Sequence, residues 1–123
     1  MTAPDLSALL LTVTTAEPQP GTKRVTVTGE IDLTTRPRLD AELDVAVASA
    51  PSRLVLDLLG VGFCAVTGVA ALGRVRARCN DAGIELVLKP SRVVRRALDL
   101  AAVGPLFRLE GSRPGEVRSL AAR

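Results

Sequence analysis

The sequence contains no histidine, no tryptophan and no tyrosine, and Phe63 and Phe107 are its only aromatic residues. The absence of histidine removes the commonest general base and one of the commonest metal ligands. Two aromatic rings do not form the stacking platform on which proteins bind single-stranded nucleic acid. The net charge of +3 is also mild. Composition therefore argues against a metal site, histidine-based catalysis and nucleic-acid binding.

Cysteines and long apolar runs are scarce too. Cys64 and Cys79 are the only cysteines, and their separation fits neither a metal site nor a redox motif. We expect free, buried thiols in a reducing compartment. No apolar run approaches the roughly 20 residues that span a membrane, and the N-terminus lacks the basic lead of a signal peptide. We therefore expect no membrane segment.

Aliphatic residues are abundant. The chain has 123 residues and is 47% hydrophobic. This length suits one domain, so we expect a single domain over residues 1–123 with a core of leucine, valine and alanine. No linker, repeat or low-complexity segment interrupts it. The sequence leaves the oligomeric state open.

The most informative stretch covers residues 53–81. Leu54–Leu56 is short and apolar, as in a strand buried on both faces, and Asp57 ends the run. Gly60 and Gly62 predict a sharp turn. From Val66 the pattern changes to that of a helix, with Gly83 placed to end it. Four residues form its apolar stripe: Gly68, Leu72, Val75 and Cys79.

The remaining pattern predicts the element order ββαβαβαβα. We expect the other strands at residues 8–15, 23–28, 84–89 and 106–109, the first two joined as a hairpin. Thr35 and Ser91 are candidate helix N-caps. The buried faces of these two helices are predicted to be Leu39, Leu43, Ala46, Val47 and Ala50, and Val94, Leu98 and Ala101. A terminal helix is expected over residues 112–120. This order favours an α/β fold with a mixed five-stranded sheet and helices packed mainly on one face.

Few residues suggest chemistry. Glu30, Asp32 and Asp57 lie at predicted strand ends, where open α/β sheets bind ligands, but we interpret them as caps of turns and helix starts. Gly60-Val61-Gly62 lacks the lysine and hydroxyl residues of a phosphate-binding loop. No nucleophile–base pair is present. We therefore expect no enzymatic activity and no cofactor.

Arginines recur on the helix that follows Ser91. Arg92, Arg95 and Arg96 lie off its apolar stripe, where they could meet an anion or an acidic partner. A solvated helix face is the alternative, and we favour it.

Three segments together resemble a known family, the STAS domain of bacterial anti-sigma factor antagonists. They are TVTGEIDLTTRPRL, LVLDLLGVGFCAVTGVAAL and LKPSRVVRRALDLAAVGPLFRL, in this order along nearly the whole chain. The resemblance implies a cytoplasmic binding module whose partner is an anti-sigma factor of the serine-kinase type. Binding would release the sigma factor, and phosphorylation of the antagonist would break the complex.

The sequence departs from the family at the phosphorylation motif. Members typically carry Asp-Ser-Ser-Gly, and the first serine is the acceptor. The corresponding residues here are Ala65, Val66, Thr67 and Gly68, so the acceptor is replaced by valine. Only Thr67 retains a hydroxyl, and a threonine at a helix start can instead be an ordinary N-cap. We expect the phosphorylation switch to be lost or altered.

The resemblance also implies where a partner binds. Ten residues at the two motifs are the candidates: Asp32, Thr34, Thr35, Gly62, Phe63, Cys64, Ala65, Val66, Thr67 and Gly68. The alternative function is a STAS-like accessory or scaffold subunit of a stress-signalling or lipid-transport complex. A pull-down would distinguish the two, because it would recover an anti-sigma kinase in the first case and a transporter subunit in the second.

Overall fold

A computed structural model describes residues 7–111 and contains five strands and four α-helices in that range. The strands are β1 (Leu11–Gln19), β2 (Thr22–Ile31), β3 (Arg53–Cys64), β4 (Glu85–Pro90) and β5 (Arg108–Leu109). The helices are α1 (Ser7–Leu10), α2 (Arg36–Ala48), α3 (Val66–Ala82) and α4 (Arg92–Leu100), with a 3-10 helix, η1, at Gly104–Leu106. The terminal helix predicted over residues 112–120 lies outside the described residues.

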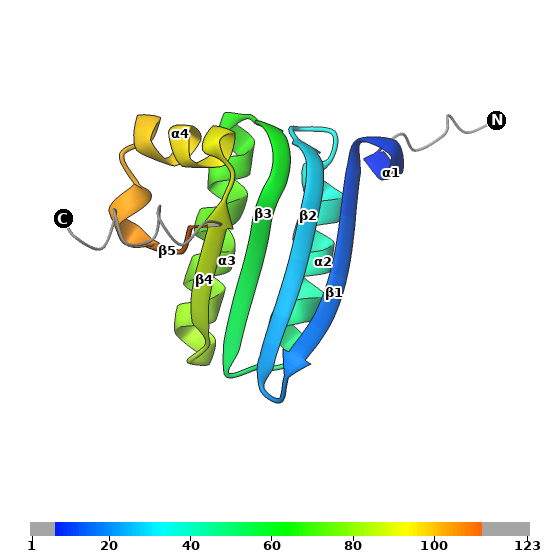
Figure 1. The fold of residues 1–123 in the computed structure, drawn as a ribbon, viewed down its shortest axis with the longest axis vertical. Helices are drawn as coiled ribbons and strands as arrows, with labels where there is room; N and C mark the ends of the chain where they lie inside the picture. The colour runs from blue at the N-terminus through cyan, green and yellow to red at the C-terminus, as the bar shows by residue number, and fades with distance from the viewer. Residues whose placement is uncertain (1–6, 112–123) are drawn as a thin grey trace.

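The strands form one sheet whose spatial order, β1-β2-β3-β4-β5, is the order of the chain (Figure 1). β1 and β2 form an antiparallel hairpin, and the remaining neighbours are parallel. Parallel neighbours need a crossover, and α2, α3 and α4 provide the three connections. The predicted mixed five-stranded sheet is confirmed.

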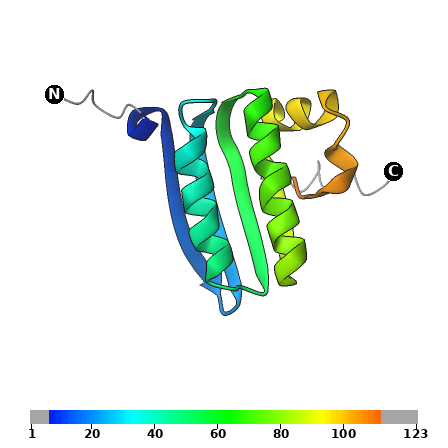
Figure 2. The same ribbon diagram turned by 180° about the vertical axis from the view of Figure 1, so that it is seen from behind.

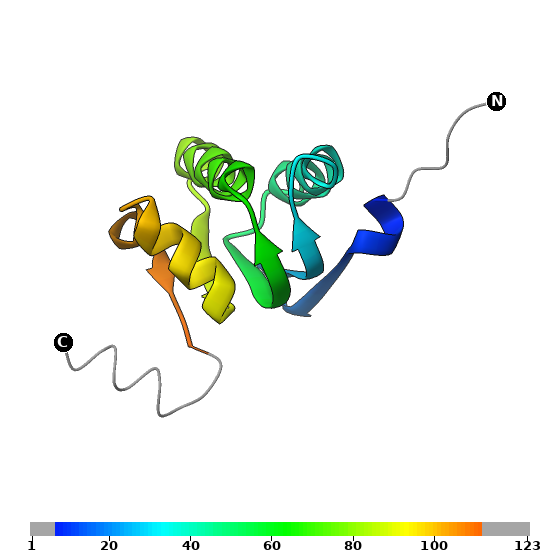
Figure 3. The same cartoon turned by 90° about the horizontal axis from the view of Figure 1, so that it is seen from above.

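Helices α2 and α3 lie side by side on one face of the sheet (Figure 2). Viewed from above, α4 is set apart from this pair, at the end of the sheet where β3 finishes and α3 begins (Figure 3). The expected packing of helices mainly on one face is therefore confirmed. The carboxyl ends of β2 and β3 share the end of the molecule at which α4 lies (Figure 1).

The core is aliphatic, as composition predicts. Leu54, Leu56 and Leu72 are completely buried, and the whole predicted stripe of α3 is buried. Gly83 ends α3 in the left-handed conformation, which confirms its predicted role. Two predictions at helix ends were wrong. Ala50 and Ala101 are exposed because α2 and α4 have already ended there.

The predicted turn at Gly60 and Gly62 was wrong, because β3 continues through both glycines to Cys64. Thr26 and Thr28 of β2 pair with Asp57 and Gly60 of β3, so β3 carries one extra residue there, and a second extra residue precedes Phe63. Such bulges bend a strand without ending it. A side chain at Gly60 would lie 3.0 Å from that of Thr28, so the strands approach closely at this point.

Several strand boundaries also differ from the prediction. β1 continues to Gln19, past the expected end at residue 15, and β4 lies one residue later than expected. β1 begins at Leu11, not at residue 8, and the preceding residues form α1. A side chain at Gly29 would lie 2.0 Å from the Leu10 carbonyl oxygen, so a glycine is required where the chain enters β1. β2 extends to Ile31, and β5 is reduced to two residues because η1 occupies the positions before it.

Candidate functional site

The candidate site lies at the carboxyl ends of β2 and β3. Ile31 and Cys64, the last residues of these strands, are paired, and the Ala65 amide donates a hydrogen bond of 2.9 Å to the Ile31 carbonyl. The residues that follow each strand therefore lie next to each other. We call residues 32–36 and 62–68 together the tip surface. It contains all ten residues that the sequence nominates for partner binding.

The first half of the tip surface is a turn that Asp32 holds together. Its Oδ1 accepts hydrogen bonds from the backbone amides of Thr34 (2.9 Å) and Thr35 (3.0 Å). The buried Thr35 hydroxyl donates to the Glu30 carbonyl at 2.8 Å and accepts from the Asp32 amide at 3.0 Å. Thr35 occupies the N-cap position of α2, as predicted, but its side chain makes no capping bond to that helix. These bonds use the polar groups internally and make the turn rigid.

The second half is the start of α3. Ala65 is the N-cap residue and has no side-chain acceptor for the first-turn amides. The alternative reading of Thr67 as an N-cap was therefore wrong, since Thr67 lies inside the helix. Its Oγ1 accepts a hydrogen bond of 3.1 Å from Arg36 on α2. Arg36 also pairs with Asp40 at 3.2 Å, so one guanidinium connects the starts of the two helices.

Close packing beneath the tip surface explains Gly68. A Cβ atom at this position would lie 2.6 Å from Cys64 Sγ and 2.9 Å from Ile31 Cγ2. The first turn of α3 can therefore approach the sheet only with glycine here.

Burial raises the pKa of the Cys64 thiol, which keeps it protonated and unreactive. The prediction of free thiols is confirmed, with Cys79 buried and Cys64 partly buried.

Large apolar side chains are exposed at the tip surface. The exposed fraction is 80% for Leu33, 49% for Phe63 and 86% for Val66. Each lies near the end of a strand or just beyond it, and the aliphatic residues of β2 and β3 are buried except for Leu59, which is 38% exposed. Exposed apolar groups gathered at one place mark surfaces that other proteins cover. The arrangement suits binding to a protein.

Two of the carboxylates at the predicted strand ends make local hydrogen bonds to backbone amides. Asp57 Oδ1 accepts a hydrogen bond from the Leu59 amide at 3.1 Å, at the bulge inside β3, so Asp57 caps a bulge of the strand and not the turn that was predicted there. Asp32 is engaged in its own turn. Within residues 7–111, no group of three or more cysteine, aspartate or glutamate side chains could hold a metal ion.

Two residues of the tip surface are missing from the ten candidates. Leu33 stood out in the sequence only as a large apolar residue between polar neighbours in a loop. Arg36 contacts Thr67 across 31 positions of sequence, and no local pattern indicates such a contact.

This combination of fold and site defines a STAS domain: a sheet in chain order, a rigid Asp32–Thr35 turn and a helix that starts over Gly68. The family model described as "Mlab, STAS domain" matches residues 14–111. The chain belongs to the STAS domain family.

The chain is similar to several anti-sigma factor antagonists. The chain is 32% identical over 109 residues to the anti-sigma-F factor antagonist RsfB of Mycobacterium tuberculosis, covering 89% of this chain and 85% of RsfB. A crystal structure of an anti-sigma factor antagonist from Mycobacterium paratuberculosis superposes with a TM-score of 0.72 at 27% identity, over 100% of both chains. The unphosphorylated antagonist SpoIIAA shares the fold, with a TM-score of 0.67 at 19% identity over 90% of this chain and 96% of SpoIIAA. None of the helices described here is long and apolar enough to cross a membrane.

Proposed function

We propose that this protein is a non-enzymatic anti-sigma factor antagonist of the cytoplasm. It binds an anti-sigma factor of the serine-kinase type through the tip surface and thereby frees a sigma factor. The observation that carries the proposal is the exposure of Leu33, Phe63 and Val66 at the segment where the sequence matches the antagonist motifs. The similarity to RsfB, an anti-sigma-F factor antagonist, supports an anti-sigma factor as the partner.

We further propose that the usual phosphorylation switch is absent. Val66 occupies the acceptor position and has no hydroxyl. Thr67 lies one residue on, and one residue of α-helix turns a side chain by about 100°. Its hydroxyl oxygen already accepts a hydrogen bond from Arg36 and is directed toward α2. Phosphoryl transfer depends on alignment of the attacking oxygen, so this hydroxyl should react poorly.

Charge at the tip surface tests the binding site. Val66→Glu adds a negative charge to an apolar contact, so the Kd for the anti-sigma factor should rise at least about tenfold, or roughly 1.4 kcal/mol. Val45→Glu is the control, because Val45 is 70% exposed on α2 outside the tip surface. Calorimetric titration with a partner from a pull-down measures both values. Equal affinities for the two variants would indicate that the interface lies outside the tip surface. Recovery of a transporter subunit instead of an anti-sigma factor would favour the scaffold alternative.

Phosphorylation tests the switch. Wild type, Thr67→Ala and the double variant Ala65→Asp/Val66→Ser are incubated with ATP and an anti-sigma kinase that modifies other family members. Intact mass is then measured. We expect a phosphate adduct on the double variant alone, because it restores the acidic residue and the acceptor hydroxyl. Complete phosphorylation of wild type that disappears in Thr67→Ala would make Thr67 a relocated switch.

A further inference from the structure

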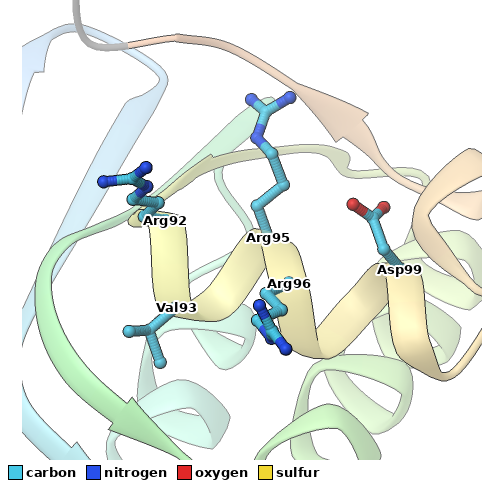
Figure 4. Close-up of a pocket in the computed structure, with 5 residues that line it drawn as sticks. All are labelled: Arg92, Val93, Arg95, Arg96 and Asp99. Atoms are coloured by element: carbon cyan, nitrogen blue, oxygen red, sulfur yellow. The ribbon is translucent and has the colours of Figure 1, made fainter.

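A basic groove lies along α4, outside the tip surface. It has a volume of about 420 Å³, and its lining includes Arg92, Val93, Arg95, Arg96 and Asp99. Figure 4 shows the three arginine side chains extending away from the helix. The opposite side of α4 holds the buried residues Val94 and Leu98, which fix the helix against the core. The arginines are therefore presented by a rigid element.

These three arginines differ from most others in the protein. Five arginines elsewhere form ion pairs, and two donate hydrogen bonds to backbone carbonyls: Arg36, Arg53, Arg74, Arg78 and Arg108, then Arg38 and Arg76. By contrast, no carboxylate among residues 7–111 lies within 4.0 Å of a guanidinium nitrogen of Arg92, Arg95 or Arg96. The groove thus concentrates three positive charges against the single negative charge of Asp99.

We propose that this groove binds a carboxylate-rich segment of the protein partner. Guanidinium groups bind carboxylates through two parallel hydrogen bonds, so three neighbouring arginines on one helix suit a segment with several acidic side chains. Val93 is 37% exposed and adds an apolar contact of the kind that a peptide can use. A nucleic acid is less suited, because the groove lining named above contains no aromatic ring on which a base could stack.

This assignment rests on the proposed function, because the acidic segment would belong to the anti-sigma factor that binds the tip surface. Helix α4 lies at the same end of the sheet as the tip surface (Figure 1). One partner can therefore contact both. The tip surface supplies apolar contacts, whereas the groove supplies charge. Complementary charge at the edge of an interface mainly accelerates association and makes it dependent on salt.

The groove is first tested without any partner. Hexaglutamate is titrated into the 15N-labelled protein, and backbone amide shifts are followed by NMR. We expect salt-sensitive shifts centred on residues 92–99, and binding about three- to tenfold weaker in Arg92→Gln/Arg96→Gln. Lys23→Gln/Arg24→Gln is the control, since it removes the same charge from the start of β2. Shifts centred elsewhere would overturn the proposal. The proposal would also be overturned if inorganic phosphate shifted the same amide signals at a lower concentration than hexaglutamate does.

The same variants are then tested with the anti-sigma factor by stopped-flow kinetics. At low ionic strength, association of Arg92→Gln/Arg96→Gln should be at least about threefold slower than wild type, and the control should change less than twofold. The difference should vanish near 1 M salt, where the Debye length is about 3 Å. Suppose that Arg92→Gln/Arg96→Gln associates at the wild-type rate with the wild-type salt dependence, while Val66→Glu binds more weakly. This result would refute the role of the groove but leave the proposed function standing. Failure of wild type to bind any anti-sigma factor would refute the proposed function, and the hexaglutamate titration would still decide the groove.

Discussion

Replacing Gly68 by alanine should destabilise this protein, whereas the same replacement at Gly73 should stabilise it. Both glycines lie in α3, but their surroundings differ. A Cβ atom at Gly68 would lie 2.6 Å from Cys64 Sγ and 2.9 Å from Ile31 Cγ2, both closer than van der Waals contact allows. A Cβ atom at Gly73 would meet no heavy atom within 4 Å. The pair therefore separates packing from helix propensity.

The magnitudes follow from these surroundings. Alanine in place of glycine inside a helix contributes about 0.5 to 1 kcal/mol, and Gly73→Ala should show this gain alone. Gly68→Ala must also displace its neighbours, and overpacking of this kind costs about 1 to 3 kcal/mol. Ile31 is β-branched and stiff, whereas Cys64 Sγ ends a side chain that can rotate, so a cost near the middle of this range, about 2 kcal/mol, should apply. We expect the two variants to differ by about 2 kcal/mol, with Gly68→Ala below wild type.

Thermal and urea denaturation followed by circular dichroism measure these differences. For a domain of this size, 1 kcal/mol shifts the Tm by roughly 4 °C, so the two variants should melt roughly 8 °C apart. The double variant Cys64→Ala/Gly68→Ala should recover part of the loss, because it removes one of the two close contacts. If Gly68→Ala is as stable as Gly73→Ala, the first turn of α3 does not approach the sheet as described.

Three further predictions concern α3 and its neighbours. Ala65→Asp should raise stability by about 0.5 to 2 kcal/mol in thermal denaturation, because it supplies the missing N-cap acceptor, and an unchanged Tm would contradict this. Leu72→Asp should cost at least about 3 kcal/mol, since Leu72 is completely buried, whereas Leu100→Asp at a 77% exposed position should cost little. The Arg74 hydrogen bond lowers the pKa of Asp44, so this carboxylate stabilises the folded state above about pH 4 and the contribution is lost as pH falls below that. Asp44→Asn should therefore cost under about 1 kcal/mol at pH 7 and nothing near pH 2, in urea titrations at both values.

The fold was predictable where one local pattern decided the outcome. The helical stripe of α3 and its terminal Gly83 were readable because burial repeats along a single face. Gly60 and Gly62 were misread because glycine serves both turns and strand bulges, and only the pairing of β3 with β2 distinguishes them. The start of β1 was missed because apolar leucines before Leu11 fit a strand and a short helix equally well.

The sequence motifs indicated which two segments form the candidate site, but they did not indicate the contacts within it. The motifs around Asp32 and Val66 placed two segments, and the structure brings those segments together. The hydrogen bond of Thr67 could not be predicted from the sequence, because its partner Arg36 belongs to another helix. The lack of an ion pair at the α4 arginines among residues 7–111 could not be predicted either, since it depends on where the carboxylates of other elements lie.

The agreement between sheet order and chain order has a consequence for synthesis on the ribosome. Each strand can join the free edge of the strands made before it, and none has to enter between two others. The β1–β2 hairpin offers an edge to β3, which then offers one to β4. Contacts between consecutive elements close short loops, which favours rapid folding. The tip surface can therefore assemble as soon as α3 emerges, before the arginine groove of α4 has been translated.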